Sequence, residues 1–214
     1  MKQYDAYLFD WDGTLARSLE MWLDIIRAEF AAVGISPDDK AVAATFGRPL
    51  DKVGMEYGMS QPDAETFSAA IKQNAHDRSL NVEVYDEALA VLEQLRNGGK
   101  KLALITTNWR EAVELMLKNH QLSDVFKVVV AAEDVTQPKP DPEGILFALD
   151  KLAITDKRRA VMVGDSAHDL DAARNAGIDS ILVYPPSHQL FYDFDELTAH
   201  RPTHVVDGLE KILA

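Results

Sequence analysis

The sequence predicts an α/β protein in which helices cover both faces of a parallel sheet and a smaller helical segment is inserted after the first strand. Short apolar runs without polar alternation recur along most of the chain, as in strands that are buried on both faces. Helical patterns separate these runs, which is the alternation that produces parallel sheets. Between residues 16 and 80, however, helical pieces are interrupted by proline and glycine, and no convincing strand occurs.

The spacing of apolar residues, together with the capping residues and glycines between them, predicts the individual strands and helices. The expected strands are residues 6–9, 101–106, 128–131, 160–164 and 180–184. The expected helices outside the interrupted segment are about 18–33, 85–99, 110–119, 143–152 and 168–177. Ser18 is a candidate N-cap for the first helix, and Gly34, Gly98-Gly99 and Gly177 are typical helix stops.

Composition narrows the class of function. The chain has 214 residues, which allows one domain or a core domain that carries an insertion. A net charge of −13 argues against nucleic-acid binding, and no apolar run approaches the roughly 18 residues of a membrane span. The absence of cysteine excludes thiol catalysis and disulfides, and it fits a cytoplasmic protein, as does an N-terminal segment unlike a secretory signal.

Polar side chains lie at or after the carboxyl ends of the first four predicted strands. Ligands bind beyond the carboxyl ends of the strands in open parallel sheets, so these residues are the candidates for a site. They are Asp10 and Asp12, then Thr106, Thr107 and Asn108, then Lys139, and finally Asp165 and Asp169. We therefore expect carboxylates, hydroxyls and one ammonium group at a single edge of the sheet.

Neighbouring carboxylates require a compensating cation, and a hard divalent ion such as Mg²⁺ prefers oxygen ligands. Asp10 and Asp12 lie in "FDWDGTL" and Asp165 in "VGDSAHD". Asp-Gly is also a common turn pair, and Asp169 could equally stabilise a helix N-terminus. Lys139, between two prolines, is either a constrained phosphate-binding cation or a solvated loop residue.

Four segments in order resemble the haloacid dehalogenase (HAD) superfamily, in its phosphoglycolate phosphatase-like and β-phosphoglucomutase-like branch. They are "DWDGT" at 10–14, "LITTN" at 104–108, "KPDP" at 139–142 and "GDSAHDLDAARNAG" at 164–177. The resemblance implies a three-layer, Rossmann-like core formed by residues 1–15 and 81–214, with a helical cap domain at 16–80. Trp11 and Arg17 depart from the usual pattern. Trp11 either shapes the floor of the pocket or packs into the core, and Arg17 either meets a substrate anion or faces solvent; packing and solvent exposure are the expected outcomes.

The resemblance also implies the residue roles. Asp10 would be the nucleophile and Asp12 the general acid and base. Asp10, the backbone carbonyl of Asp12 and Asp165 would hold Mg²⁺, with Asp169 as a further candidate. Thr106, with Thr107 and Asn108 beside it, and Lys139 would bind the phosphoryl group. Arg48, in the "FGRPL" segment of the cap, would read an anionic group of the substrate or would be an ordinary surface arginine.

The expected function is hydrolysis of a small phosphorylated metabolite, phosphoglycolate-like or a sugar phosphate, through an aspartyl-phosphate. A phosphomutase that uses the same nucleophile is the alternative. A non-catalytic binding protein is disfavoured because the complete residue set is present, and a 2-haloacid dehalogenase because those enzymes lack an acid at the position of Asp12. The expected partner is a phosphomonoester, with no nucleic acid or membrane, and the expected state is a monomer or homodimer.

Overall fold

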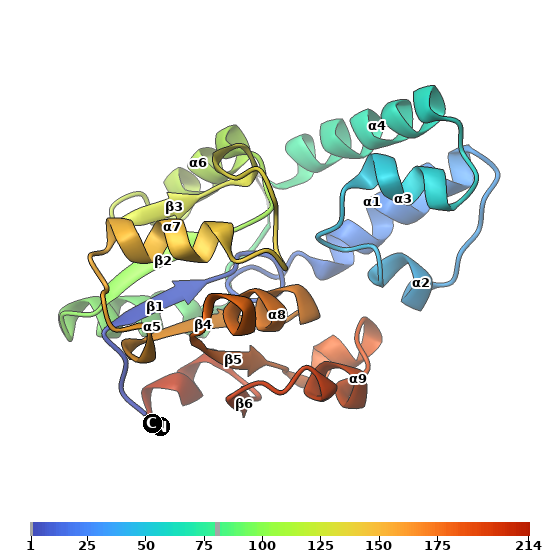
Figure 1. The fold of residues 1–214 in the computed structure, drawn as a ribbon. Coiled ribbons are helices and arrows are strands. Elements are labelled where there is room, and N and C mark those ends of the chain that lie inside the picture. The colour runs from blue at the N-terminus through green and yellow to red at the C-terminus, as the bar shows by residue number, and fades with distance from the viewer. Residues whose placement is uncertain (1, 80–81) are drawn as a thin grey trace.

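The computed structural model describes residues 2–79 and 82–214 and has a parallel sheet at its centre (Figure 1). In this part of the chain the sheet has six strands in the order β3-β2-β1-β4-β5-β6. The strands are β1 (Ala6–Phe9), β2 (Lys101–Ile105), β3 (Val128–Val130), β4 (Ala160–Gly164), β5 (Asp179–Val183) and β6 (His204–Val206). The predicted α/β class and its parallel sheet are confirmed.

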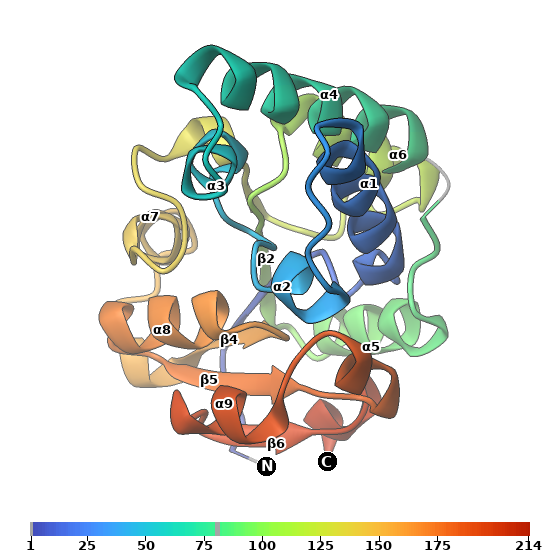
Figure 2. The same cartoon turned by 90° about the vertical axis from the view of Figure 1, so that its right-hand side faces the viewer.

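Helices cover both faces of the sheet because successive residues of a strand point to opposite sides. In β1, Tyr7 and Phe9 belong to the apolar cluster that includes α5 and α6, whereas Leu8 belongs to the cluster that includes α7 and α8. Figure 2 shows these two helix pairs on opposite sides of the strands. The helices of this part of the molecule are α5 (Asp86–Asn97), α6 (Arg110–Asn119), α7 (Glu143–Lys151), α8 (Ala167–Ala176) and α9 (Phe194–Ala199).

The segment between β1 and α5 is helical and forms the cap. Its helices are α1 (Leu19–Ala32), α2 (Asp39–Ala43), α3 (Leu50–Glu56) and α4 (Gln61–Ser79). The cap has an aromatic centre, in which the ring of Phe30 lies 4.6 Å from that of Tyr57 and 4.8 Å from that of Phe67. Figure 1 shows the cap beyond the ends to which the strand arrows point, where a parallel sheet binds its ligands.

Two antiparallel linkers join the cap to the sheet. The backbone N–H of Arg17 donates to the carbonyl of Glu83 at 2.8 Å, and that of Tyr85 donates to Leu15 at 2.9 Å. This crossing lies close to the expected domain limits. The division into 1–15 with 81–214 and 16–80 stays a prediction, since its second boundary falls on residues 80 and 81, outside the described residues.

Two local features differ from the expectations. Helix α1 does begin directly after Ser18, but the Ser18 side chain makes no capping hydrogen bond. Its backbone is helical (φ −106°, ψ −7°) rather than extended as at a capped N-terminus, so the hydroxyl is not directed at the first turn. Strand β6 and helix α9 lie outside the predicted elements. In the described part of the chain, none of the helices is both long and apolar enough to cross a membrane.

Candidate active site

The carboxyl ends of β1 and β4 place two acids side by side. The strands are paired with Phe9 opposite Val163, and the backbone N–H of Asp10 donates to the Val163 carbonyl at 2.9 Å. Asp10 follows β1 directly, and Asp165 follows Gly164, the last residue of β4. The two acids therefore leave adjacent strands at the same edge of the sheet, as the sequence predicts.

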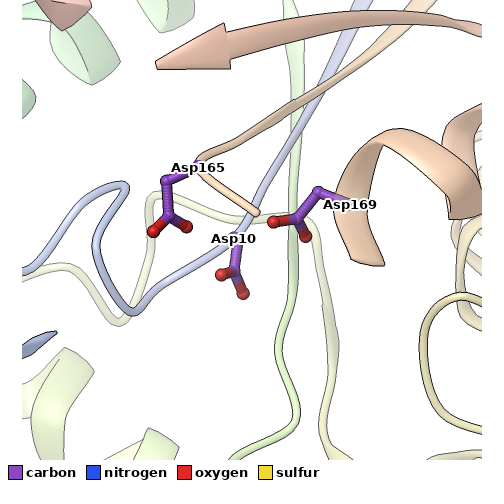
Figure 3. Close-up of side chains that lie close together, drawn as sticks. All are labelled: Asp10, Asp165 and Asp169. Atoms are coloured by element: carbon purple, nitrogen blue, oxygen red, sulfur yellow. The ribbon is translucent and has the colours of Figure 1, made fainter. Parts of the chain in front are cut away.

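Asp10, Asp165 and Asp169 form a buried cluster of carboxylates (Figure 3). One carboxylate oxygen from each residue lies within 4.8 Å of the others. The three residues are 7%, 1% and 0% exposed, so little water screens their mutual repulsion. Asp169 reaches the cluster from the first turn of α8. Each of the three carboxylates offers an oxygen ligand, and a divalent metal ion prefers such ligands. The cluster is therefore suited to a divalent metal ion.

In the described part of the chain, Lys139 places an ammonium group against this cluster. Its Nζ donates to Asp10 Oδ1 at 2.8 Å and to Asp169 Oδ1 at 2.6 Å, and also to the Ile105 carbonyl at 3.1 Å. Burial alone would lower the pKa of Lys139, but Asp10 and Asp169 raise it above its usual value. Lys139 is therefore a buried ammonium group in this structure and not a solvated loop residue.

Burial shifts the pKa values of two acids in the cluster. Burial raises the pKa of Asp10 to about 7, although the charge of Lys139 acts in the opposite direction. Burial also raises the pKa of Asp165 well above its usual range, with the charges of Asp169 and Asp10 adding to the effect. A single lysine does not neutralise three carboxylates, so a further positive charge would stabilise their ionised forms.

The surroundings of Asp165 fit a metal ion. Among the described residues, its Oδ2 is buried and has no hydrogen-bond partner, while Oδ1 accepts a hydrogen bond from the Thr14 hydroxyl at 3.2 Å. Gly13, at φ +70°, passes so close that a Cβ there would lie 2.2 Å from Oδ2. A buried carboxylate oxygen without a donor is a suitable ligand for a cation.

Unlike Asp165, Asp169 accepts hydrogen bonds from described residues at both of its carboxylate oxygens. Its Oδ1 accepts the hydrogen bond from Lys139, and its Oδ2 accepts from the Ser166 hydroxyl at 2.6 Å and the Ser166 N–H at 3.2 Å. Both oxygens thus already have donors, which suits a residue that orients Lys139. Its direct ligation of metal stays a prediction.

Among the described residues, Asp12 is not a member of the cluster of three buried acids, although, in addition to burial, its charge raises the pKa of Asp10. The Oδ1 of Asp12 accepts a hydrogen bond from the Trp22 indole N–H at 2.8 Å, and its Oδ2 accepts from the Asn108 side-chain amide at 2.5 Å. Asp12 also lines the cavity described below. The expected metal contact of this residue involves its backbone carbonyl, so the position of the side chain does not bear on it.

The residues that follow β2 are arranged differently from one another. Thr107 and Asn108 line the large cavity, whereas Thr106 is 4% exposed and lines a smaller neighbouring one. The Thr106 hydroxyl accepts a hydrogen bond from the Asn108 backbone N–H at 3.1 Å and still has its own hydrogen to donate. Phosphate binding by these three residues stays a prediction.

A cavity of about 320 Å³ lies between the cap and the strand ends. Asp10, Asp12, Lys139 and Asp165 line it from the sheet side. Arg48 and Lys72 line it from the cap, and Arg48 also forms an ion pair with Glu56 at 2.5 Å. The cavity therefore combines buried acids and Lys139 at one end with cationic side chains of the cap.

Several residues of the cavity have no counterpart among the predicted site residues. Trp22, Lys72, His168 and Tyr192 line it, from α1, α4, α8 and the segment before α9. The apolar periodicity of α1 assigns Trp22 only to a buried face, and no local signal directs it to Asp12. Of the two departures from the family pattern, Trp11 is 1% exposed and packed in the core, and Arg17 is exposed beside Tyr85, both as expected.

Comparison with known proteins identifies the family. The profile of haloacid dehalogenase-like hydrolases matches residues 7–183, which include the sheet edge, the cap and all four sequence segments. The chain belongs to the haloacid dehalogenase-like hydrolase family. It is an enzyme of the HAD-like hydrolase and phosphatase class, with the buried acids and Lys139 at the position where this α/β fold binds its ligands.

Individual relatives cover nearly the whole HAD-like chain. Pyrophosphatase PpaX from Bacillus velezensis is 33% identical over 226 residues, which span 99% of this chain and 96% of the relative. Pyrophosphatase PpaX from Bacillus mycoides is 33% identical over 214 residues, which span 98% and 95%. The crystal structure of a hydrolase from Pseudomonas syringae has a TM-score of 0.84 at 23% identity, covering 98% of this chain and 96% of that one, and so shares the fold.

Proposed function

We propose that this protein is a Mg²⁺-dependent phosphatase that hydrolyses a small phosphorylated metabolite through an aspartyl-phosphate on Asp10. The observation that carries the proposal is the hydrogen bond from the buried Lys139 to Asp10, 2.8 Å long, within a cluster of acids that lines the cavity. The charge of Lys139 favours the ionised, nucleophilic form of Asp10 against the effect of burial on its pKa, and the same ammonium group attracts phosphoryl oxygens.

In the first step Asp10 attacks the phosphorus atom. A bond forms between an Asp10 oxygen and phosphorus, the bond to the leaving oxygen breaks, and Asp12 gives that oxygen a proton. In the second step a water attacks the same phosphorus, Asp12 takes the proton of the water, and Asp10 is released as a carboxylate. Lys139 balances the negative charge of the phosphoryl oxygens in both steps.

Asp10, Asp165 and the backbone carbonyl of Asp12 would hold Mg²⁺, whose chemistry is to neutralise phosphoryl charge and orient the phosphoester. The unpartnered Oδ2 of Asp165 supports this assignment among the described residues. Asp169, whose two oxygens are engaged by Lys139 and Ser166, would act by positioning Lys139. Thr106, Thr107 and Asn108 would add neutral donors around the phosphoryl group.

The chemistry of the cavity bears on the substrate. Arg48 and Lys72 offer positive charge to a second anionic group at the cap end, as a phosphoglycolate-like compound or a sugar bisphosphate would carry. The two Bacillus relatives are named pyrophosphatases, so pyrophosphate is also a candidate. The alternative is a phosphomutase, in which a second hydroxyl of a sugar phosphate accepts the phosphoryl group from Asp10.

The test is phosphate release from pyrophosphate, 2-phosphoglycolate and glucose 1-phosphate with Mg²⁺. We expect free phosphate from at least one of them, complete inhibition by EDTA that added Mg²⁺ reverses, and a loss of about 10³-fold or more in Asp10→Asn, which lacks the nucleophile. Acid quenching should trap one phosphoryl group on Asp10. Isomerised sugar phosphate without free phosphate would favour the mutase, and full activity of Asp10→Asn would overturn the mechanism.

A further inference from the structure

We infer that Trp22 is a positioning residue, through which the cap fixes the orientation of the Asp12 carboxylate for proton transfer. The inference rests on the proposed role of Asp12 as general acid and base. It assigns a function to a side chain that lies in the cap and outside the four sequence segments that carry the family resemblance. Its basis is the pair of hydrogen bonds that hold the two oxygens of Asp12.

The two oxygens of Asp12 are held from different parts of the molecule. Trp22 lies in the first turn of α1, where its backbone N–H donates to the Ser18 carbonyl at 3.0 Å, and its indole N–H reaches Asp12 Oδ1 at 2.8 Å. Asn108 lies after β2, and its amide reaches Asp12 Oδ2 at 2.5 Å. The cap holds one oxygen and the sheet holds the other, so the carboxylate plane is fixed in two directions.

Asn108 is itself anchored, which makes the arrangement rigid on the sheet side. Its backbone N–H donates to Thr106 Oγ1 at 3.1 Å, and its carbonyl accepts from the Ala132 N–H at 2.9 Å. Asn108 is also 6% exposed. The cap side depends on Trp22, whose ring packs at the edge of the large apolar cluster. A carboxylate with one anchored donor could still rotate, and Trp22 supplies the second point that prevents rotation.

The chemistry of the two donors suits this role. The indole N–H of Trp22 only donates, and the amide of Asn108 also presents an N–H, so neither competes with Asp12 as a proton carrier. An ionised carboxylate oxygen has about two acceptor positions, so one hydrogen bond per oxygen leaves room for a proton. The contacts therefore orient Asp12 without blocking it. They also make the alignment of Asp12 depend on the position of α1.

A positioning role predicts an effect that depends on the leaving group. Phenyl phosphate and p-nitrophenyl phosphate have similar shapes, but only the poorer leaving group, phenolate, needs a proton as it departs. The ratio kcat/KM reports the first chemical step, in which Asp12 acts as acid. Misalignment of Asp12 should therefore lower kcat/KM much more for phenyl phosphate than for p-nitrophenyl phosphate.

The experiment compares Trp22→Phe with the wild type on both substrates in the presence of Mg²⁺. Phenylalanine keeps an aromatic ring and removes the N–H. We expect kcat/KM to fall by about tenfold or more for phenyl phosphate and by less than about threefold for p-nitrophenyl phosphate. Trp109→Phe is the matched control, because Trp109 lines the same cavity but does not bond Asp12. Trp109→Phe should change kcat/KM for both substrates by the same factor.

Equal losses on the two substrates in Trp22→Phe, or no loss on either, would overturn the inference. If Trp22→Phe does not fold, Trp22→Leu also removes the indole N–H and should give the same asymmetry; a uniform effect of Trp22→Leu would also count against the inference. Failure of the proposed function is distinguishable, because the wild type would then release no phosphate from either compound or Asp10→Asn would remain active.

Discussion

Replacement of Gly13 by alanine tests whether the chain keeps space free for the Asp165 carboxylate. Gly13 has φ +70°, a region that side chains with a Cβ rarely adopt, and this strain costs about 1–2 kcal/mol. A Cβ at Gly13 would also lie 2.2 Å from Asp165 Oδ2, so the carboxylate or the loop must move. Overpacking of this kind adds about 1–3 kcal/mol. We therefore expect Gly13→Ala to lower the free energy of unfolding by about 2–5 kcal/mol.

Gly99 provides the matched control. It has φ +73°, but nothing lies within 4 Å of the position that a Cβ would occupy. Gly99→Ala should therefore lower the free energy of unfolding only by the backbone strain of about 1–2 kcal/mol. The difference in unfolding free energy between the two variants then isolates the contact with Asp165. For a chain of this size, each kcal/mol corresponds to about 2–4 °C in Tm.

The assay is thermal unfolding of both variants and the wild type, first in EDTA and then with increasing Mg²⁺. A ligand that binds only the folded protein raises Tm as its concentration rises. Gly99→Ala should keep the Mg²⁺-dependent rise of the wild type, whereas Gly13→Ala should lose most of it, because Asp165 is displaced. If the two variants were equally stable and responded equally to Mg²⁺, the reasoning about Asp165 would be refuted.

Two further predictions concern the charges of the site. Because burial raises the folded-state pKa of Asp10 to about 7 from about 4 in the unfolded chain, the folded protein binds more protons between these values, and this contribution to stability is lost as pH rises from 4 to 7. In EDTA, Tm should therefore fall more between pH 5 and pH 7.5 for the wild type than for Asp10→Asn; identical slopes would contradict the assignment. Lys139→Met removes the ammonium group from two buried carboxylates and should cost about 3–5 kcal/mol in urea unfolding. The exposed Lys151 serves as control, since Lys151→Met should stay within about 0.5 kcal/mol, and a Lys139 variant as stable as this control would show that the acids do not need the cation.

The parts of the fold that could be predicted from sequence are those with dense local signals. Strands β1 and β4 are fully apolar and buried, and α6 has a clear amphipathic pattern, so their limits match the predictions closely. Strand β6 is a short edge strand in which Val205 is 44% exposed, and α9 is a single short helix. Elements so short and so weakly buried lack the periodicity on which the prediction depends.

The same distinction applies to the site. Asp10, Lys139 and Asp165 follow buried parallel strands or lie between prolines, so the topology that brings strand ends together also brings these side chains together. For the residues after β2, the order along the chain does not say which hydroxyl faces the cavity. Thr107 lines both the large cavity and the smaller one, whereas Thr106 belongs to the lining of the smaller cavity.

The contact between Trp22 and Asp12 shows where sequence reasoning necessarily stops. Trp22 satisfies the apolar pattern of α1 as well as any large hydrophobic residue would, so its periodicity carries no information about its N–H. The direction of that N–H depends on how the cap is seated on the sheet, which the paired linkers at Arg17 and Tyr85 and the cavity walls determine together. A residue whose role arises from the arrangement of two parts of the molecule can be identified only when both parts are in place. For the same reason, substitutions in the linkers that shift α1 should disturb Asp12 without touching it.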